Sequence, residues 1–93
     1  MHKTVYTRQY AVLLHELRAA RTRSGLTQTE LAIKLEMSQA DVSKCERGVR
    51  RLDVIELRLW VEALGERLVD FLSVVEDHLE VDVVRSTRKA IPG

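Results

Sequence analysis

Hydrogen-bond donors and positive charges recur along residues 39–47 at the spacing of one helix face. On a helix of 3.6 residues per turn, Val42 and Cys45 would point inward, toward a core. The outward positions would be Gln39, Ala40, Ser43, Lys44 and Arg47. These five contain no carboxylate, whereas an exposed helix face usually mixes both signs of charge. The pattern predicts a surface that binds a partner rich in hydrogen-bond acceptors, and the alternative is an ordinary solvent-exposed face.

Residues for catalysis or metal binding do not cluster elsewhere in the sequence. His2, His15 and His78 are far apart, and no cysteine or carboxylate group gives them metal-ligand spacing. No nucleophile elbow, glycine-rich phosphate loop or zinc-deaminase motif occurs. Trp60 is expected to fill the core, with stacking on a ligand as the alternative. We therefore predict no enzymatic activity, no metal and no cofactor.

The size and composition favour one helical domain. The chain has 93 residues, of which 45% are hydrophobic, and only one proline and four glycines. Apolar residues recur at helical spacing almost throughout, which predicts an all-α fold. The apolar runs are too short for a membrane span, no secretory signal is expected, and a lone cysteine excludes an intrachain disulfide. Cytoplasm is the expected compartment.

Charge is distributed unevenly, although the net charge is only +1. Residues 1–51 contain ten lysines and arginines against five acidic residues, and residues 52–93 contain five against nine. The asymmetry indicates a basic face for a polyanion, with the acidic half turned elsewhere. Ordinary surface scatter is the alternative.

Three stretches, LTQTEL, MSQADV and LDVIEL, carry the pattern of a helix start. In each, an apolar residue precedes a capping residue, and an acid follows three positions later. We expect N-caps at Thr27, Ser38 and Asp53, whose side chains accept from first-turn amides. The acids that would bond back to the caps are Glu30, Asp41 and Glu56. Apolar staples would join Leu26 to Leu31, Met37 to Val42, and Leu52 to Leu57.

The remaining elements follow from periodicity and breaker residues. A first helix is predicted at about residues 7–22, a fourth at 53–64 ended by a left-handed Gly65, and a fifth at 67–78. The stretch LEVDVVR alternates like a short strand, or is the frayed end of the fifth helix. We expect one domain over residues 1–80, and an extension over residues 81–93 whose end, from residue 86, is polar and mobile.

Two short helices joined by a tight turn, the second with a donor-rich face, are the arrangement that fits a helix into the DNA major groove. The stretches LTQTELA, SQADVSKCERG and RRLDVIELRLWVEALG resemble the helix-turn-helix domain of the phage-repressor and Cro type, the xenobiotic-response-element-like (XRE) regulators. The resemblance covers about residues 13–72. It implies a five-helix, lambda-repressor-like fold and a sequence-specific DNA-binding transcriptional regulator.

The resemblance also implies roles for individual residues. Base-reading positions fall on Gln39, Ala40, Ser43 and Lys44, whose chemistry suits adenine, thymine methyl and guanine edges. Phosphate contacts fall on Gln28, Arg50 and Arg51, with Arg23 and Arg47 as secondary candidates. Arg21 and Glu46 match a buried salt bridge of the family, and two unrelated surface charges are the alternative.

Two positions depart from the family pattern. Glu36 stands in the turn where members often carry glycine, and the position commonly needs a positive φ that glutamate tolerates poorly. Cys45 replaces a branched apolar residue. We expect Cys45 to pack in the core, with a redox-sensing thiol as the alternative.

A single recognition helix reads few base pairs, so we expect a homodimer on a palindromic operator, acting as a repressor. An apolar stripe after Gly65 exceeds what one packed helix needs, which predicts a dimer interface there or a surface for another protein, with residues 79–84 as a possible added edge strand. Its members are Leu68, Phe71, Leu72, Val75 and Leu79.

Two other functions stay open at this point. One is an antitoxin, or the related restriction–modification controller, which would bind a basic toxin through the acidic C-terminal half. The other is a helical protein-interaction module without DNA binding. No membrane partner is expected.

Overall fold

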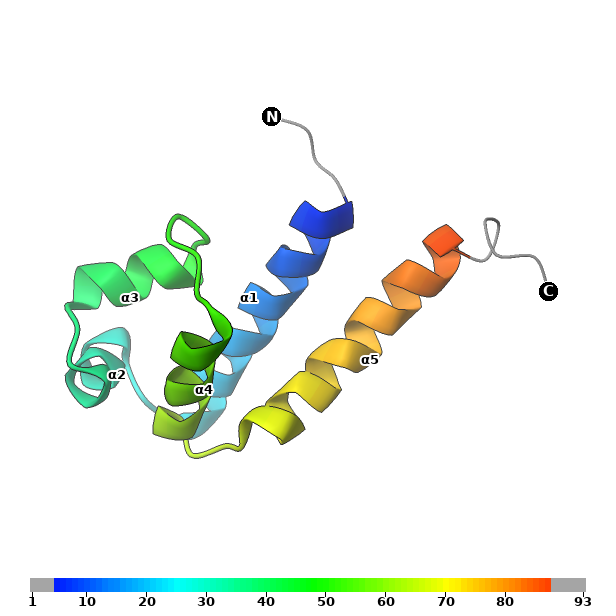
Figure 1. Ribbon diagram of the computed structural model, residues 1–93. Coiled ribbons are helices and arrows are strands. Elements are labelled where there is room, and N and C mark those ends of the chain that lie inside the picture. Colours follow the sequence, from blue (N-terminus) through cyan, green and yellow to red (C-terminus); the bar gives the residue numbers. More distant parts are fainter. Residues whose placement is uncertain (1–4, 88–93) are drawn as a thin grey trace.

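The computed structural model describes the backbone of residues 5–87 and the side chains of residues 7–79. Five α-helices and no strand occur in this range: α1 (Val5–Ser24), α2 (Gln28–Leu35), α3 (Gln39–Glu46), α4 (Val54–Ala63) and α5 (Leu68–Thr87). Figure 1 shows α1 and α5 running antiparallel, with α4 packed against α5 and with α2 and α3 on the far side of α4. The predicted all-α, five-helix fold is confirmed.

The three predicted helix starts are present. The side chains of Thr27, Ser38 and Asp53 each accept a hydrogen bond from the amide three residues later. At Thr27 and Asp53 the acid at that position also accepts from the cap's own amide, at 2.9 and 3.0 Å. Asp41 forms no such return bond to Ser38 within the described residues, because its side chain is one methylene shorter than glutamate. Local capping therefore sets where α2, α3 and α4 begin.

Both long helices extend beyond the predicted bounds. α1 covers Val5–Ser24 instead of residues 7–22, and Gly25, at φ 78°, follows it. α5 continues through LEVDVVR to Thr87, so the strand alternative for this stretch, and the edge strand proposed from it, are wrong. A strand needs a neighbour for its backbone groups, whereas a helix satisfies them internally. Residues 88–93 of the expected tail lie outside the described residues.

The turn between α2 and α3 places Glu36 at φ 56° and ψ 44°, in the left-handed region. The amide of Glu36 bonds to the Ile33 carbonyl at 3.2 Å, and that of Met37 to the Ala32 carbonyl at 3.0 Å. The positive φ expected from the family pattern is therefore present, on a residue with a side chain. Such a residue costs roughly 1–2 kcal/mol relative to an ordinary backbone conformation.

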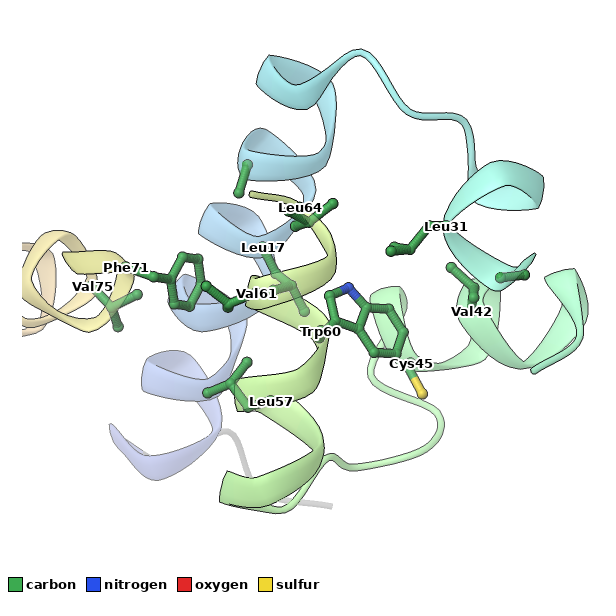
Figure 2. Packing of buried hydrophobic residues seen from close by; sticks show 12 residues of the cluster. Leu17, Leu31, Val42, Cys45, Leu57, Trp60, Val61, Leu64, Phe71 and Val75 are labelled. Atoms are coloured by element: carbon green, nitrogen blue, oxygen red, sulfur yellow. The ribbon is translucent and has the colours of Figure 1, made fainter. Parts of the chain in front are cut away.

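The core draws on all five helices. Figure 2 shows Trp60 of α4 between α1 and the α2–α3 pair, with Val61 facing Phe71 of α5. Trp60 is 1% exposed, as expected for a core residue, and Cys45 is completely buried as part of the same core cluster. The core thus fixes α3 through Val42 and Cys45, and leaves its other side to solvent.

The apolar stripe on α5 is used inside the protomer. Phe71 and Val75 are only 2% and 3% exposed, and Leu68, Leu72 and Leu79 pack against the same core. The prediction of a dimer interface is therefore corrected for Phe71 and Val75, since buried side chains offer no area to a second molecule. The stripe exceeded what one helix needs because α5 packs along α1 as well as against α4.

Candidate nucleic-acid interface

α3 presents the predicted donor-rich face to solvent. Of its outward residues, Gln39, Ala40, Lys44 and Arg47 are exposed, and Ser43 is half-buried. Val42 and Cys45 on the opposite side have no exposed surface. The packing of α2 against α3 holds the helix in place. A rigid eight-residue helix with one uncovered, carboxylate-free flank is a shape that enters the major groove.

A chain of side-chain hydrogen bonds runs from the protein interior to the exposed start of α3. Arg21 of α1 contacts Glu46 through two nitrogens, at 2.6 and 3.1 Å. Glu46, whose side chain is 1% exposed, accepts a third bond from the Gln28 Nε2 at 2.9 Å. Gln28 then accepts from the Nε2 of Gln39 at 2.7 Å. The chain orients the Gln39 amide and leaves it an acceptor oxygen and one N–H.

The buried pair matches the arrangement that the resemblance implies for Arg21 and Glu46, and two further bonds secure it. Arg21 also donates to the Leu26 carbonyl at 3.1 Å, across the α1–α2 connection. Arg18 donates to the Glu46 backbone carbonyl at 2.7 Å. The role of Arg18 was not predicted. Its spacing of three residues from Arg21, on one side of α1, is the sequence feature that could have indicated it.

The loop that follows α3 is anchored to α1. Gly48 has φ 80°, and a Cβ at this position would lie 2.9 Å from the Leu14 side chain. The Leu52 amide donates to the Tyr10 hydroxyl at 3.2 Å. The Arg51 guanidinium lies over the ring of the same tyrosine, 4.1 Å from its centroid. Tyr10, which the sequence did not single out, therefore contacts two successive residues of this loop, Arg51 and Leu52.

Arg50 and Arg47 also have partners within the protein. Arg50 donates to the Cys45 sulfur at 3.1 Å and to Glu56 at 2.7 Å. The bond to Cys45, and then the ion pair with Glu56, raise the pKa of Arg50 above its ordinary value. Arg47 donates to the Ser43 hydroxyl at 3.2 Å, on the exposed side of α3. Arg50 is therefore the more restrained of these two candidate phosphate contacts.

Arg23 lies far from the candidates on the loop after α3. It pairs with Glu66, on the connection between α4 and α5, at 3.1 Å. Along α1 it lies thirteen residues from Tyr10, which holds Arg51. At 1.5 Å per residue this separates the two sites by about 20 Å. The structure thus gathers Gln28, Gln39, Ser43, Lys44 and Arg47 on α2 and α3, with Arg50 and Arg51 on the adjoining loop.

Two short helices, a left-handed turn and a solvent-facing second helix held by a buried ion pair define a helix-turn-helix protein. Comparison with known proteins gives the same class. The family model described as a helix-turn-helix domain matches residues 12–80. The chain is also similar to a solved structure described as an XRE-family like protein from Pseudomonas syringae pv. tomato str. DC3000. That similarity has 39% sequence identity and a TM-score of 0.76, and covers 80% of this chain and 90% of that one.

The chain therefore belongs to the XRE/Cro-type helix-turn-helix family. It is a DNA-binding regulator of a family that is not typically enzymatic. No curated protein matches it at a significant level. None of the helices in the described residues combines the length and apolar character that spanning a membrane requires.

Proposed function

We propose that the protein is a sequence-specific transcriptional repressor that binds a palindromic operator as a homodimer, with α3 in the major groove. The exposed, carboxylate-free face of α3 is the observation that carries this proposal. Dimeric helix-turn-helix proteins place two recognition helices on half-sites about one helical turn apart. Occupation of a promoter by such a dimer would block transcription.

Base reading would come from the first two turns of α3. The Gln39 amide keeps one N–H and its oxygen available, which suits the N7 and N6 groups of adenine. Lys44 is exposed and suits the O6 and N7 acceptors of guanine. Ala40 and Ser43 lie between them, and the Ala40 methyl can pack on a thymine methyl.

Phosphate binding would come from Gln28, Arg47 and the loop arginines. The Gln28 amide has one N–H left after its bond to Glu46. Arg51 lies on this loop with its guanidinium over the Tyr10 ring, and its positive charge would attract a DNA phosphate. Arg50 would have to give up its bonds to Glu56 and Cys45 in order to contact a phosphate. Arg23 would contribute least, because of its distance from the loop.

Selection of bound DNA from a random pool tests the proposal, because it yields the operator, its symmetry and the half-site spacing together. Replacing Gln39 or Lys44 by alanine should relax preference at one base pair each, at about 1–3 kcal/mol. Arg51→Glu should instead weaken binding to all sequences and reduce the slope of log K against log salt by about one per lost contact. Equal losses from both kinds of variant on selected and random DNA would contradict the assigned roles.

An antitoxin, or a restriction–modification controller, is the second candidate. Asp70, Glu76 and Asp77 on α5 are exposed, and together they would attract a basic protein. Co-purification of the chain with a basic partner, lost on replacing these three acids by lysine, would favour this candidate. A protein-interaction module without DNA binding would show no gel shift on its own upstream DNA at low salt.

A further inference from the structure

The outer face of α4 carries apolar side chains that no part of the described protein covers. Ile55 is 63% exposed and Leu59 is 54% exposed, and they lie one helical turn apart. These two residues, with the ion pairs beside them, are called the α4 strip below. Single exposed apolar residues are ordinary, but a group of them on one helix face marks an interaction surface.

An arginine–glutamate pair flanks the apolar residues on each side. Arg58 and Glu62, at 3.3 Å, lie on the side of α4 toward Val54. Arg50 and Glu56, at 2.7 Å, lie on the side toward α2. The strip therefore has an apolar centre and a charged rim, as protein interfaces usually do. Its two arginines and two glutamates give it no net charge.

Beside Leu59 the surface is hollowed by about 200 Å³. The apolar part of the lining comes from four elements that meet here, namely the α2 end, the turn after it, the loop before α4, and α4 itself. Its apolar residues are Leu35, Met37, Leu52, Leu59 and Trp60. The strip thus has both protruding apolar side chains and a recess next to them that can receive one.

Among the described side chains, α5 offers a less suitable surface. A second hollow of about 260 Å³ lies between α1 and α5 and is lined in part by Leu13, Leu72 and Leu79. The exposed described residues of α5 include Val69 and Val74, but also the acids Asp70, Glu76 and Asp77. Two copies brought together along that acidic side would repel each other. The neutral α4 strip has no such penalty, because each arginine of one copy can face a glutamate of the other.

We infer that the α4 strip is the surface on which a second copy of this chain docks. In a two-fold symmetric dimer the same patch of each copy meets the other. Ile55 of each copy would then enter the hollow beside Leu59 of the other copy. The strip includes Arg50 of the loop that also carries Arg51, so the contact would join the DNA-binding elements of the two copies. The inference rests on the homodimer of the proposed function and gives it an interface.

The test measures the molar mass of the full chain by sedimentation over a concentration series. The wild type should form dimers. Ile55→Arg and Leu59→Arg should each raise the dimer dissociation constant by roughly 30-fold or more, because each change occurs twice at the centre of the contact. Val69→Arg and Val74→Arg, which change the exposed valines of α5 (58% and 44% exposed), should leave it unchanged. Thermal melting checks that each variant folds.

A charge exchange tests the rim without touching the apolar centre. Arg58→Glu leaves the strip with excess negative charge and should weaken the dimer, whereas the combined Arg58→Glu and Glu62→Arg exchange should restore it. The inference would be overturned if the wild type were monomeric at every concentration. It would also be overturned if Val69→Arg abolished the dimer and Leu59→Arg did not. Binding to a single DNA half-site distinguishes the two proposals. If the proposed function holds, a variant that is folded but monomeric still binds the half-site. If the proposed function fails, the wild type does not bind the half-site either.

Discussion

The pairing of Arg21 with Glu46 gives the sharpest test of what holds the recognition helix. Arg21→Met keeps most of the side-chain volume and removes the positive charge. The Glu46 side chain is 1% exposed, so its carboxylate would stay buried without a counter-ion. Breaking a buried pair in this way costs about 3–5 kcal/mol. Because Gln28 still donates to Glu46, we expect the loss of stability to lie at the lower end of this range, about 3 kcal/mol.

The reverse substitution should cost less. Glu46→Leu leaves a guanidinium that is 19% exposed and still bonded to the Leu26 carbonyl. We expect about 1–3 kcal/mol for this variant. The combined Arg21→Met and Glu46→Leu protein buries no unpaired charge, so it should recover most of the loss, as apolar replacements of buried pairs often do.

Urea unfolding of the wild type, the two single variants and the double variant completes a double-mutant cycle. For a domain of this size a 3 kcal/mol loss lowers Tm by about 12–24 °C, which a thermal melt resolves easily. The reasoning fails if Arg21→Met costs under about 1 kcal/mol, or if the two single losses simply add in the double variant. Either result would mean that Arg21 does not compensate the buried carboxylate.

Three further comparisons test the local backbone and the cap of α3, each by the midpoint of urea unfolding. Gly48→Ala should lower the stability by about 1–3 kcal/mol more than Gly65→Ala. Both positions have positive φ, but only a Cβ at residue 48 would press on Leu14. Equal losses of stability would rule out the close approach of Leu14 to residue 48. Glu36→Gly should stabilise the fold by up to about 1 kcal/mol, since glycine relieves the left-handed backbone at φ 56° and loses part of that gain to chain entropy. Ser38→Ala should cost about 1 kcal/mol through the lost cap of α3, and a loss under a few tenths would contradict its capping role.

The helix-turn-helix unit was predictable because its signals are local. Caps at Thr27, Ser38 and Asp53 act on amides within three residues, so their effect does not depend on the rest of the fold. The exposed face of α3 followed from the same helix start and the period of 3.6 residues. The resemblance to a known family then supplied the pairing of Arg21 with Glu46, which no local rule gives.

The length of α5 was not predictable in the same way. The alternation in LEVDVVR fits a strand and a helix end equally well, and a strand would need a neighbour that the described residues do not provide. The roles of Tyr10 and Arg18 were missed for a similar reason. Both act on residues at least 28 positions away, and sequence spacing within one helix does not show such contacts.

The sequence by itself determined that this protein has short helices starting at residues 28, 39 and 54 and a recognition face without carboxylates, because capping and periodicity act within a few residues. Only the tertiary structure decided which apolar side chains are left over. α1 and α4 cover Phe71 and Val75 of α5, whereas Ile55 and Leu59 of α4 stay exposed. Burial depends on which helices pack against each other, and the apolar pattern of a single helix does not contain that information.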